Sequence, residues 1–359
     1  MSILKVAQLA GVSTSTVSRV INDHPRVAAA TADTVRRAMK QLSFAPSARR
    51  PGPKPGSGNG LRTATIAFLV FGTSGSQTAP AFESLLRGVS AASVDQGLNM
   101  IFSFVSDPTE LPPRIVERGV DGLLLHGERP GPAVIQKLQA LPTVWLMANR
   151  LRPTWGDQVM PDNTVVGQLA AQYLARRGHR DLAYLWVGSP SWSLRVRAMA
   201  FEQFAQELGA RVTLLESIGR GASSNGNGNG ADHAATDYWR DDNLATSVGA
   251  LVDQLVSTTP RPTGLFVAED RLTPHVDAAL ARRGLRVGDD LDLISCNNER
   301  PHLLGLRSVP AEIDIRVESI GRRGVEQLLW RMRNPSRSER ICAMIEPCLI
   351  EPEPAKQLF

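Results

Sequence analysis

The stretch VAQLAGVSTSTVSRVIN, residues 6–22, decides how the start of this chain folds. Apolar residues at helical spacing within residues 3–10 predict a short helix, and Gly11 ends it. A second short helix follows, capped by Ser13, with two valines and an isoleucine on its inner face. Two short helices joined by a glycine-containing turn are typical of a helix-turn-helix.

A third helical segment is predicted over residues 31–42, with its cationic side chains outward, so that three helices form one minimal bundle. The second helix has an outward face of short polar side chains and one arginine: Thr14, Ser15, Ser18, Arg19 and Asn22. An arginine can bind guanine bidentately in the major groove, and hydroxyls can reach base edges or phosphates. From the hydroxyls alone, an ordinary solvated helix face is an equally good interpretation.

Positive charge is concentrated at the start of the chain. Residues 1–60 contain nine Lys or Arg residues against two Asp residues, a net charge of +7, so the remaining residues carry −2. A basic head on a near-neutral body indicates a polyanionic partner for one end only. The three cysteines lack metal-like spacing, and neither a signal peptide nor a membrane-spanning run is present, which predicts a soluble cytoplasmic protein without disulfides.

Together with RVAAATADTVRRAMKQLSFAP at 26–46, the opening stretch resembles the DNA-binding headpiece of the lactose-repressor (LacI/GalR) family. That family shows a V-A-x-x-A-G-V-S-x-x-T-V-S-R-V-x-N signature, which this chain matches at nearly every position from Val6 to Asn22. The resemblance implies a headpiece over residues 1–43 and a sequence-specific transcription regulator. It further implies a repressor that binds a palindromic DNA operator as a homodimer.

The resemblance also implies contacts with DNA at individual positions. The family's main base-reading positions fall on Thr14 and Ser15, and a third falls on Arg19. Positions associated with contact to the phosphate backbone fall on Ser13, Thr16, Ser18, Asn22, Arg26 and Thr31. Because Thr14 and Ser15 have small side chains, we expect them to read the half-site less strongly than the Tyr–Gln pair of some relatives.

Residues 44–62 predict a linker rich in proline and glycine, where the family resemblance breaks. Members of the family usually have a hinge helix there, which wedges a leucine into the minor groove. In this chain Pro51, Pro53 and Pro55 occupy that stretch. Each interior proline costs a helix about 3 kcal/mol, so the usual hinge helix is not expected.

The linker also carries three cations, Arg49, Arg50 and Lys54. Two interpretations remain open. The segment is either an extended arm that enters an A·T-rich minor groove, whose potential attracts arginine, or a flexible tether with incidental attraction to phosphates.

From residue 63 onward, short apolar runs alternate with helical patterns. The expected strands lie in TATIAFLVFG, NMIFSFVS, DGLLLHG, PTVWLMAN, DLAYLWVG, GLFVAED and LDLISCNN, and a helix is expected in FESLLRGVSAASVDQG. Buried strands alternating with helices predict βαβ units and parallel sheets covered on both faces, an α/β fold. A Gly-x-Gly-x-x-Gly fingerprint after the first strand and a P-loop are both absent from the sequence.

The family resemblance continues through this body, carried by DNTVVGQLAAQYLARRGHRDLAYL, SWSLRVRAMAF, GLFVAEDRLTPHVDAALARRGLRVGDDLDLISCNN and IDIRVESIGRRGVEQLL. It implies a two-lobed domain over residues 63–350, similar to periplasmic sugar-binding proteins, that binds an effector and dimerises. The fold class implied for the whole chain is therefore a three-helix headpiece followed by two α/β lobes with parallel sheets.

The same alignment implies residues that contact the effector. Arg195 and Asp270 fall at effector-contact positions, and Asn297 falls where the family often has Asp. Trp192 or Phe71 could stack on the apolar face of a polyol held by these polar groups. We therefore expect a small, sugar-like effector. The competing interpretations are a surface ion pair for Arg195 and a helix cap for Asp270.

Other chemistries find no support in the sequence. Six histidines are scattered without metal-ligand spacing, and no Gly-x-Ser-x-Gly elbow or Cys–His arrangement stands out, so we expect no metal, no cofactor and no enzymatic activity. The body alone would also suit an intracellular solute-binding protein without a role on DNA. The basic head and the missing signal peptide argue against that alternative.

Overall fold

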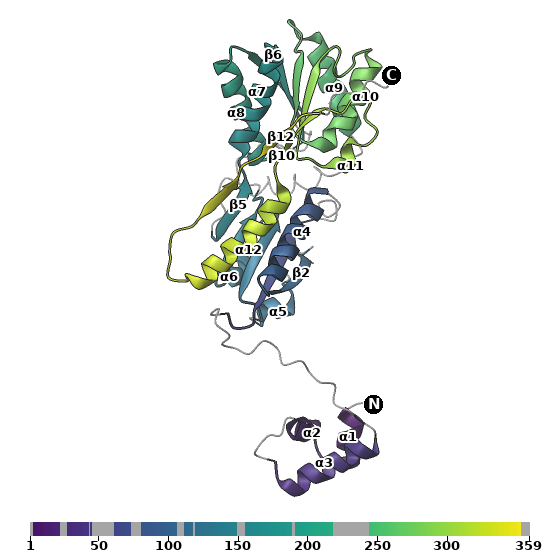
Figure 1. Ribbon diagram of the computed structural model, residues 1–359, viewed down its shortest axis with the longest axis vertical. Coiled ribbons are helices and arrows are strands. Elements are labelled where there is room, and N and C mark those ends of the chain that lie inside the picture. The colour runs from purple at the N-terminus through teal and green to yellow at the C-terminus, as the bar shows by residue number, and fades with distance from the viewer. Residues whose placement is uncertain are drawn as a thin grey trace. The chain divides into compact units, whose positions relative to one another are not determined.

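In the computed structural model of the 359-residue chain, the described residues are 3–21, 27–42, 44, 61–72, 80–105, 111–117, 119–148, 155–188, 191–217 and 244–352. The chain divides into two compact units, Met1–Ser57 and Gly58–Phe359. Figure 1 shows that the described part of the first unit is helical and that the second consists of two lobes built from strands and helices.

The first unit contains α1 (Ile3–Ala10), α2 (Thr14–Ile21) and α3 (Ala29–Gln41). Gly11 adopts φ +62° in the turn between α1 and α2, a conformation that glycine reaches without steric cost. The buried core of this unit consists of Val6, Ala7, Val17, Val20, Val35 and Ala38. The three helices predicted from the sequence are confirmed, and the third begins two residues before the expected start.

The second unit contains two six-stranded sheets, one in each lobe. The N-lobe sheet has the order β11-β5-β4-β3-β1-β2, and the C-lobe sheet has the order β12-β10-β9-β8-β6-β7. The N-lobe strands are β1 (Thr65–Phe71), β2 (Asn99–Val105), β3 (Gly122–Gly127), β4 (Thr143–Leu146), β5 (Asp157–Pro161) and β11 (Cys342–Ile345). The C-lobe strands are β6 (Asp181–Val187), β7 (Arg211–Ser217), β8 (Gly264–Val267), β9 (Asp292–Cys296), β10 (Ala311–Asp314) and β12 (Cys348–Ile350).

Helices cover both sheets. The N-lobe contains α4 (Pro80–Asp95), α5 (Pro113–Val116), α6 (Pro132–Leu138) and α12 (Val317–Arg333). The C-lobe contains α7 (Asn163–Arg176), α8 (Trp192–Glu207), α9 (Leu244–Ser257), the 3₁₀ turn η4 (Asp270–Leu272), α10 (Thr273–Arg282) and α11 (Arg300–Leu303). Strands paired in the described residues are parallel except β10 and β12, so the expected parallel α/β fold is confirmed with one antiparallel edge.

Successive side chains of the central strands point to opposite faces of the sheet, and this gives the N-lobe two separate apolar cores. Ile66, Phe68 and Val70 of β1 point to the face covered by α4 and α12, while Leu69 and Phe71 point to the opposite face. All five side chains are buried, as expected for a central parallel strand covered on both sides. Because the middle of the strand is buried and apolar on both sides, polar sites in this lobe lie at the strand ends.

Three chain segments cross between the lobes. They connect β5 to α7 through Asp162, β10 to α12 through Ile315 and Arg316, and β11 to β12 through residues 346 and 347. Asp162 caps α7, because its carboxylate accepts the backbone N–H groups of Thr164 and Val165 at 3.0 and 3.2 Å. The crossings place the carboxyl end of β5 next to the start of a C-lobe helix.

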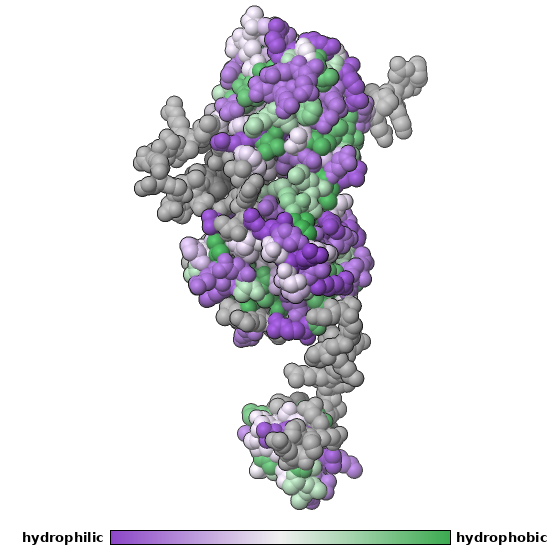
Figure 2. Space-filling model, turned by 90° about the vertical axis from the view of Figure 1, so that its left-hand side faces the viewer, coloured by the Kyte–Doolittle hydropathy of each residue, from purple (hydrophilic) through white to green (hydrophobic). Residues whose placement is uncertain are grey.

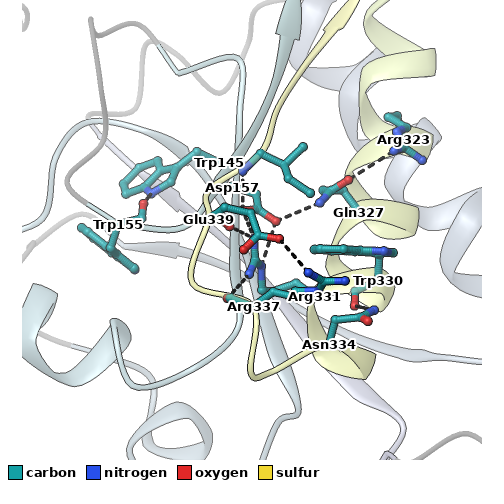
Figure 3. A network of polar contacts seen from close by, with 11 residues as sticks. Trp145, Trp155, Asp157, Arg323, Gln327, Trp330, Arg331, Asn334, Arg337 and Glu339 are labelled. Atoms are coloured by element: carbon teal, nitrogen blue, oxygen red, sulfur yellow. Dashed lines mark hydrogen bonds and ion pairs between the residues drawn. The ribbon is translucent and has the colours of Figure 1, made fainter.

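A buried ion pair fixes the segment that leads from α12 into β11. Arg331 of α12 donates to both carboxylate oxygens of Asp157, at 2.6 and 3.0 Å, and Gln327 donates to the same carboxylate at 2.8 Å. Figure 3 shows these side chains converging on Asp157, which is fully buried. Arg331 also donates to the backbone carbonyls of Arg337 and Glu339, and so holds the segment that leads into β11.

Helices α4 and α12 lie side by side on one face of the N-lobe (Figure 1). Glycines make this close approach possible, because a Cβ atom at Gly88 would lie 2.1 Å from the carbonyl oxygen of Glu318. Hydrophilic and hydrophobic residues are interspersed over the visible face of the molecule in Figure 2. Within the described residues, none of the helices combines the length and apolar character that a membrane crossing requires.

Candidate nucleic-acid interface and ligand site

Helix α2 starts with a hydroxyl cap. The Ser13 hydroxyl accepts the backbone N–H of Thr16 at 3.2 Å and lies 2.7 Å from the Ser15 hydroxyl. An N-terminal cap of this kind satisfies a backbone donor that the helix itself leaves free. The sequence thus starts α2 at Thr14 and fixes which side chains point away from the core.

The exposed face of α2 carries the predicted base-reading residues together. Thr14, Ser15 and Arg19 are all exposed, while Val17 and Val20 are buried against the other two helices. None of the described residues makes a hydrogen bond or an ion pair with Arg19. A short polar helix face with an exposed guanidinium can dock in a major groove and donate to base edges.

The structure places four of the six predicted phosphate-contacting residues. Ser13 and Ser18 are exposed, and Thr16 and Thr31 are half-buried at or near the starts of α2 and α3. Asn22 and Arg26 lie outside the described residues, as do the linker residues Arg49, Arg50 and Lys54 and the prolines Pro51, Pro53 and Pro55.

In the body, Arg197 forms the centre of a buried polar cluster near the first crossing segment. Its guanidinium donates to Asn163 Oδ1 at 2.9 Å, to the carbonyl oxygen of Ala268 at 2.8 Å and to Asn297 Oδ1 at 3.2 Å. The residue is 4% exposed. It therefore joins the start of α7 to the carboxyl ends of β8 and β9, where ligands of open α/β sheets bind.

Asp270 lies beside this cluster and is fully buried. One carboxylate oxygen bonds with the Ser295 hydroxyl, and the other accepts the backbone N–H of Glu299 at 2.6 Å. The pKa of Asp270 is raised to about 7, mainly by burial and to a smaller extent by the neighbouring Glu312 and Glu299, while the two hydrogen bonds oppose the shift. Asp270 can therefore carry a proton near neutral pH.

Four aromatic rings gather at the carboxyl ends of the N-lobe strands. The rings of Phe82 and Phe104 are 5.6 Å apart, those of Phe102 and Phe104 are 4.8 Å apart, and His126 stacks on Phe82 at 6.1 Å. His126 is held by a bond between Nδ1 and the carbonyl of Leu146, and burial lowers its pKa. Phe104 is 38% exposed, so this cluster presents an apolar face to solvent.

The predicted effector residues are only partly brought together. Asp270 accepts the backbone N–H of Glu299, and Asn297 forms a hydrogen bond with the Glu299 side chain. Trp192 is half-buried in the first turn of α8. Arg195 is exposed on the outer face of that helix, and Phe71 is fully buried in the N-lobe core, where its ring is not available for stacking.

Sequence reasoning missed Arg197, although a signal for it was present. The stretch SWSLRVRAMAF resembles a family segment of the form R-x-x-(G)-F, and counting back from Phe201 places the arginine of that segment at Arg197, two positions after Arg195. Helical spacing agrees, because Leu194, Arg197 and Phe201 lie on the buried face of α8 while Arg195 lies outside it. Among the described residues there is no group of three His, Cys, Asp or Glu side chains that could hold a metal ion.

Comparison with known protein families covers nearly the whole chain. Residues 2–47 match the model of the bacterial regulatory proteins of the lacI family, and residues 65–217 match the periplasmic binding proteins and sugar binding domain of the LacI family. Residues 171–351 match a periplasmic binding protein-like domain. The chain belongs to the LacI family. The resemblance inferred from the sequence is confirmed, and the chain is a DNA-binding transcriptional regulator with an effector-binding domain.

Curated LacI-family relatives match the chain over its length. The transcriptional repressor PurR of Vibrio cholerae is 26% identical over 369 residues, covering 99% of this chain and 98% of the relative. The ribose operon repressor of Escherichia coli K12 is 26% identical over 356 residues, covering 96% and 97%. These relatives are repressors, which agrees with the expectation that the chain is not an enzyme.

Solved structures of the LacI family share the fold. A lac repressor dimer bound to operator and an anti-inducer has a TM-score of 0.63 at 18% identity, and the match covers 98% of both chains. A complex of the regulator CelR with cellobiose has a TM-score of 0.62 at 21% identity, also over 98% of both chains.

Proposed function

We propose that this chain is a repressor that binds a palindromic operator as a homodimer. The observation that carries the proposal is the exposed face of α2, where Thr14, Ser15 and Arg19 lie together on a packed three-helix unit. In this proposal Arg19 reads a guanine, and Thr14 and Ser15 read neighbouring bases. A helix-turn-helix dimer places two such helices in successive major grooves, which calls for two symmetric half-sites. A regulator of chromosomal DNA works in the cytoplasm of a bacterium.

Around this face, the hydroxyls of Ser13, Thr16, Ser18 and Thr31 are assigned to the phosphate backbone, together with Asn22 and Arg26. Such contacts set the position of the helix but carry no base information. The proposal is tested by measuring binding of the purified chain to DNA fragments that flank its own gene, at low salt. We expect at least one fragment to bind more tightly than random DNA of equal length. Equal binding to all fragments would contradict the proposal.

The effector proposed for the body is a sugar or a related polyol. Arg197, Asn163 and Asn297 supply polar groups at the strand ends, and the aromatic cluster around Phe104 supplies an apolar face. Sugars combine hydroxyls with apolar C–H faces and suit such a mixed lining. Support also comes from relatives that regulate a ribose operon or bind cellobiose. Asp270 and Trp192 remain assigned to the floor and the rim of this site. Arg195 remains assigned to the rim only as a positive charge, because its side chain is exposed.

The effector proposal is tested by calorimetric titration of the chain with a panel of monosaccharides and disaccharides. We expect one sugar to bind, Arg197→Lys to weaken that binding, and Arg195→Lys to leave it unchanged. The reason is that a lysine cannot reproduce the several directed donors of a buried guanidinium, whereas an exposed position needs only charge. An unchanged affinity in Arg197→Lys, or a loss in Arg195→Lys, would overturn this assignment.

The role of the basic linker is tested by changing Arg49, Arg50 and Lys54 to alanine together. If the linker enters the minor groove, DNA selection with the variant loses a preference for A·T pairs at the operator centre. If it is a tether, the same sequence is selected and only the salt dependence of binding becomes shallower, by up to about 0.9 log units per lost phosphate contact.

A further inference from the structure

A cavity opens at the end of the N-lobe that lies away from the C-lobe. It has a volume of about 620 Å³ and is lined by residues of α5, α6, α12 and the segment before β1. Asp121 and Pro142 of its lining directly precede β3 and β4, so the cavity lies at the amino ends of the strands. Figure 1 shows α5 at this end of the lobe. The clusters around Arg197 and Phe104 lie at the carboxyl ends, so this cavity is separate from the proposed effector site.

Much of the cavity wall is apolar. Ile115 is buried, and Leu111 and Leu141 are half-buried and pack on the same N-lobe core. Met332 forms the wall on the side of α12, and Gly122 leaves room for it, because a Cβ atom there would lie 3.0 Å from the Met332 sulfur. Ligand pockets of about 300–1,000 Å³ are mostly apolar and carry a few placed polar groups, and this cavity has that size and lining.

Asp121 is the one acidic side chain among the described residues that line the cavity, and the chain itself occupies it. Its buried carboxylate accepts the backbone N–H groups of Arg62 and Thr63, at 3.1 and 2.9 Å, and the Thr63 hydroxyl at 3.1 Å. These bonds fix the chain where the linker predicted over residues 44–62 meets the body. A cationic ligand would have to displace these donors to reach the carboxylate.

Two cationic side chains of the lining are exposed, Lys137 in the last turn of α6 and Arg62. In the described part of the chain, neither the ammonium nor the guanidinium forms a hydrogen bond. The ion pair between Arg62 Nε and Asp121 Oδ1 spans 3.8 Å, which is longer than a hydrogen bond. The cavity therefore combines apolar walls with two cations whose donors can take a new acceptor.

We propose that this cavity binds a small amphipathic carboxylate, an anion with a short alkyl chain or an aromatic ring. The apolar part packs between Ile115, Leu141 and Met332, where burial of each CH₂ group is favourable. The carboxylate lies at the rim and pairs with Lys137 and with Arg62, whose planar guanidinium can bind both carboxylate oxygens. The bound anion thus contacts the last residue of the predicted linker.

The test is titration of the purified full chain with sodium hexanoate, followed by saturation-transfer NMR of the ligand. We expect saturable binding. Hexanol lacks the charge and hexylamine reverses it, so both should bind at least about tenfold more weakly, because each of two exposed ion pairs contributes about a factor of five. Acetate lacks the apolar chain and should also bind at least about tenfold more weakly. No saturable binding of hexanoate, or equal binding of hexanol, would overturn the proposal.

Four variants locate the site. Lys137→Gln and Arg62→Gln should each weaken hexanoate binding by about fivefold. Ala140→Phe should abolish saturable binding, because Ala140 lines the cavity and is exposed, so that the larger side chain fills the cavity without disturbing the core. Arg129→Gln is the matched control, because Arg129 is an exposed cation that follows β3 at the opposite end of the same sheet. Its affinity should equal that of the parent.

Unchanged affinity in Lys137→Gln or Ala140→Phe, or an equal loss in Arg129→Gln, would show that hexanoate binds elsewhere and would overturn the proposal. The samples contain neither operator nor sugar. A negative result here therefore leaves the proposed repressor function standing, and failure of operator binding leaves this site standing.

Discussion

Replacing Asp270 with asparagine should make the body more stable at high pH. The carboxyl group is fully buried, and its pKa is about 7 against an ordinary value of 3.8. A raised pKa means that the folded chain binds the proton more tightly than the unfolded chain. The contribution of this proton to the free energy of unfolding is fully present below pH 3.8 and is lost as pH rises through 7. At 1.36 kcal/mol per pH unit, the whole loss is at most about 4 kcal/mol.

Asparagine fits the same bonds without a charge. Its carbonyl oxygen can accept the N–H of Glu299, and its amide can donate to the Ser295 hydroxyl, which bonds onward to Thr273 at 2.8 Å. We therefore expect the advantage of Asp270→Asn over the parent, in free energy of unfolding, to grow by up to about 3 kcal/mol between pH 5 and pH 8.

The assay is urea unfolding of both proteins at the two pH values, followed by tryptophan fluorescence, which reports on the body because all six tryptophans lie there. Asp253→Asn is the control for removing a carboxylate, because Asp253 is exposed on α9 and pairs with Arg283. A stability difference between Asp270→Asn and the parent that is equal at pH 5 and pH 8 would show that ionisation of Asp270 does not destabilise the folded body.

The remaining predictions concern packing, the buried ion pair and DNA. Arg331→Met should lower the free energy of unfolding by about 3–5 kcal/mol in urea denaturation, because Asp157 is left buried without its cation. Gly88→Ala should destabilise the body by about 1–3 kcal/mol in the same assay, because its Cβ meets a carbonyl of α12, whereas Gly249→Ala, in open space on α9, should be neutral or stabilising by up to about 1 kcal/mol. Arg19→Met should weaken operator binding by about 1–3 kcal/mol in a titration and relax the preference for one base pair in each half-site.

Local patterns were sufficient to predict the headpiece and the central strands. Helical spacing and Gly11 defined the first two helices, and apolar runs such as TATIAFLVFG became β1 and its parallel neighbours. The strands β5, β7, β10, β11 and β12 were not predicted. Their residues alternate between buried, half-buried and exposed positions or form runs of three to five residues, so they carry a weaker hydrophobic signal.

The ligand site was harder to predict because tertiary burial decides it. Arg195 and Arg197 are the same residue type on the same helix. Only the rotation of α8 about its own axis decides that Arg197 is buried and Arg195 is exposed. Phe71 ends a central strand, and its orientation depends on which face each residue of that strand occupies. The contact of Glu299 with Ala81 joins residues 218 positions apart, which no local pattern encodes.

Selection of DNA from a random library by the purified full chain is the decisive experiment for operator reading by α2. We expect enrichment of an inverted repeat with two equal half-sites, and loss of the preference for one base pair in each half-site when Arg19 is changed to methionine. Enrichment of no sequence, or of a site without twofold symmetry, would contradict a repressor that reads a palindrome through α2.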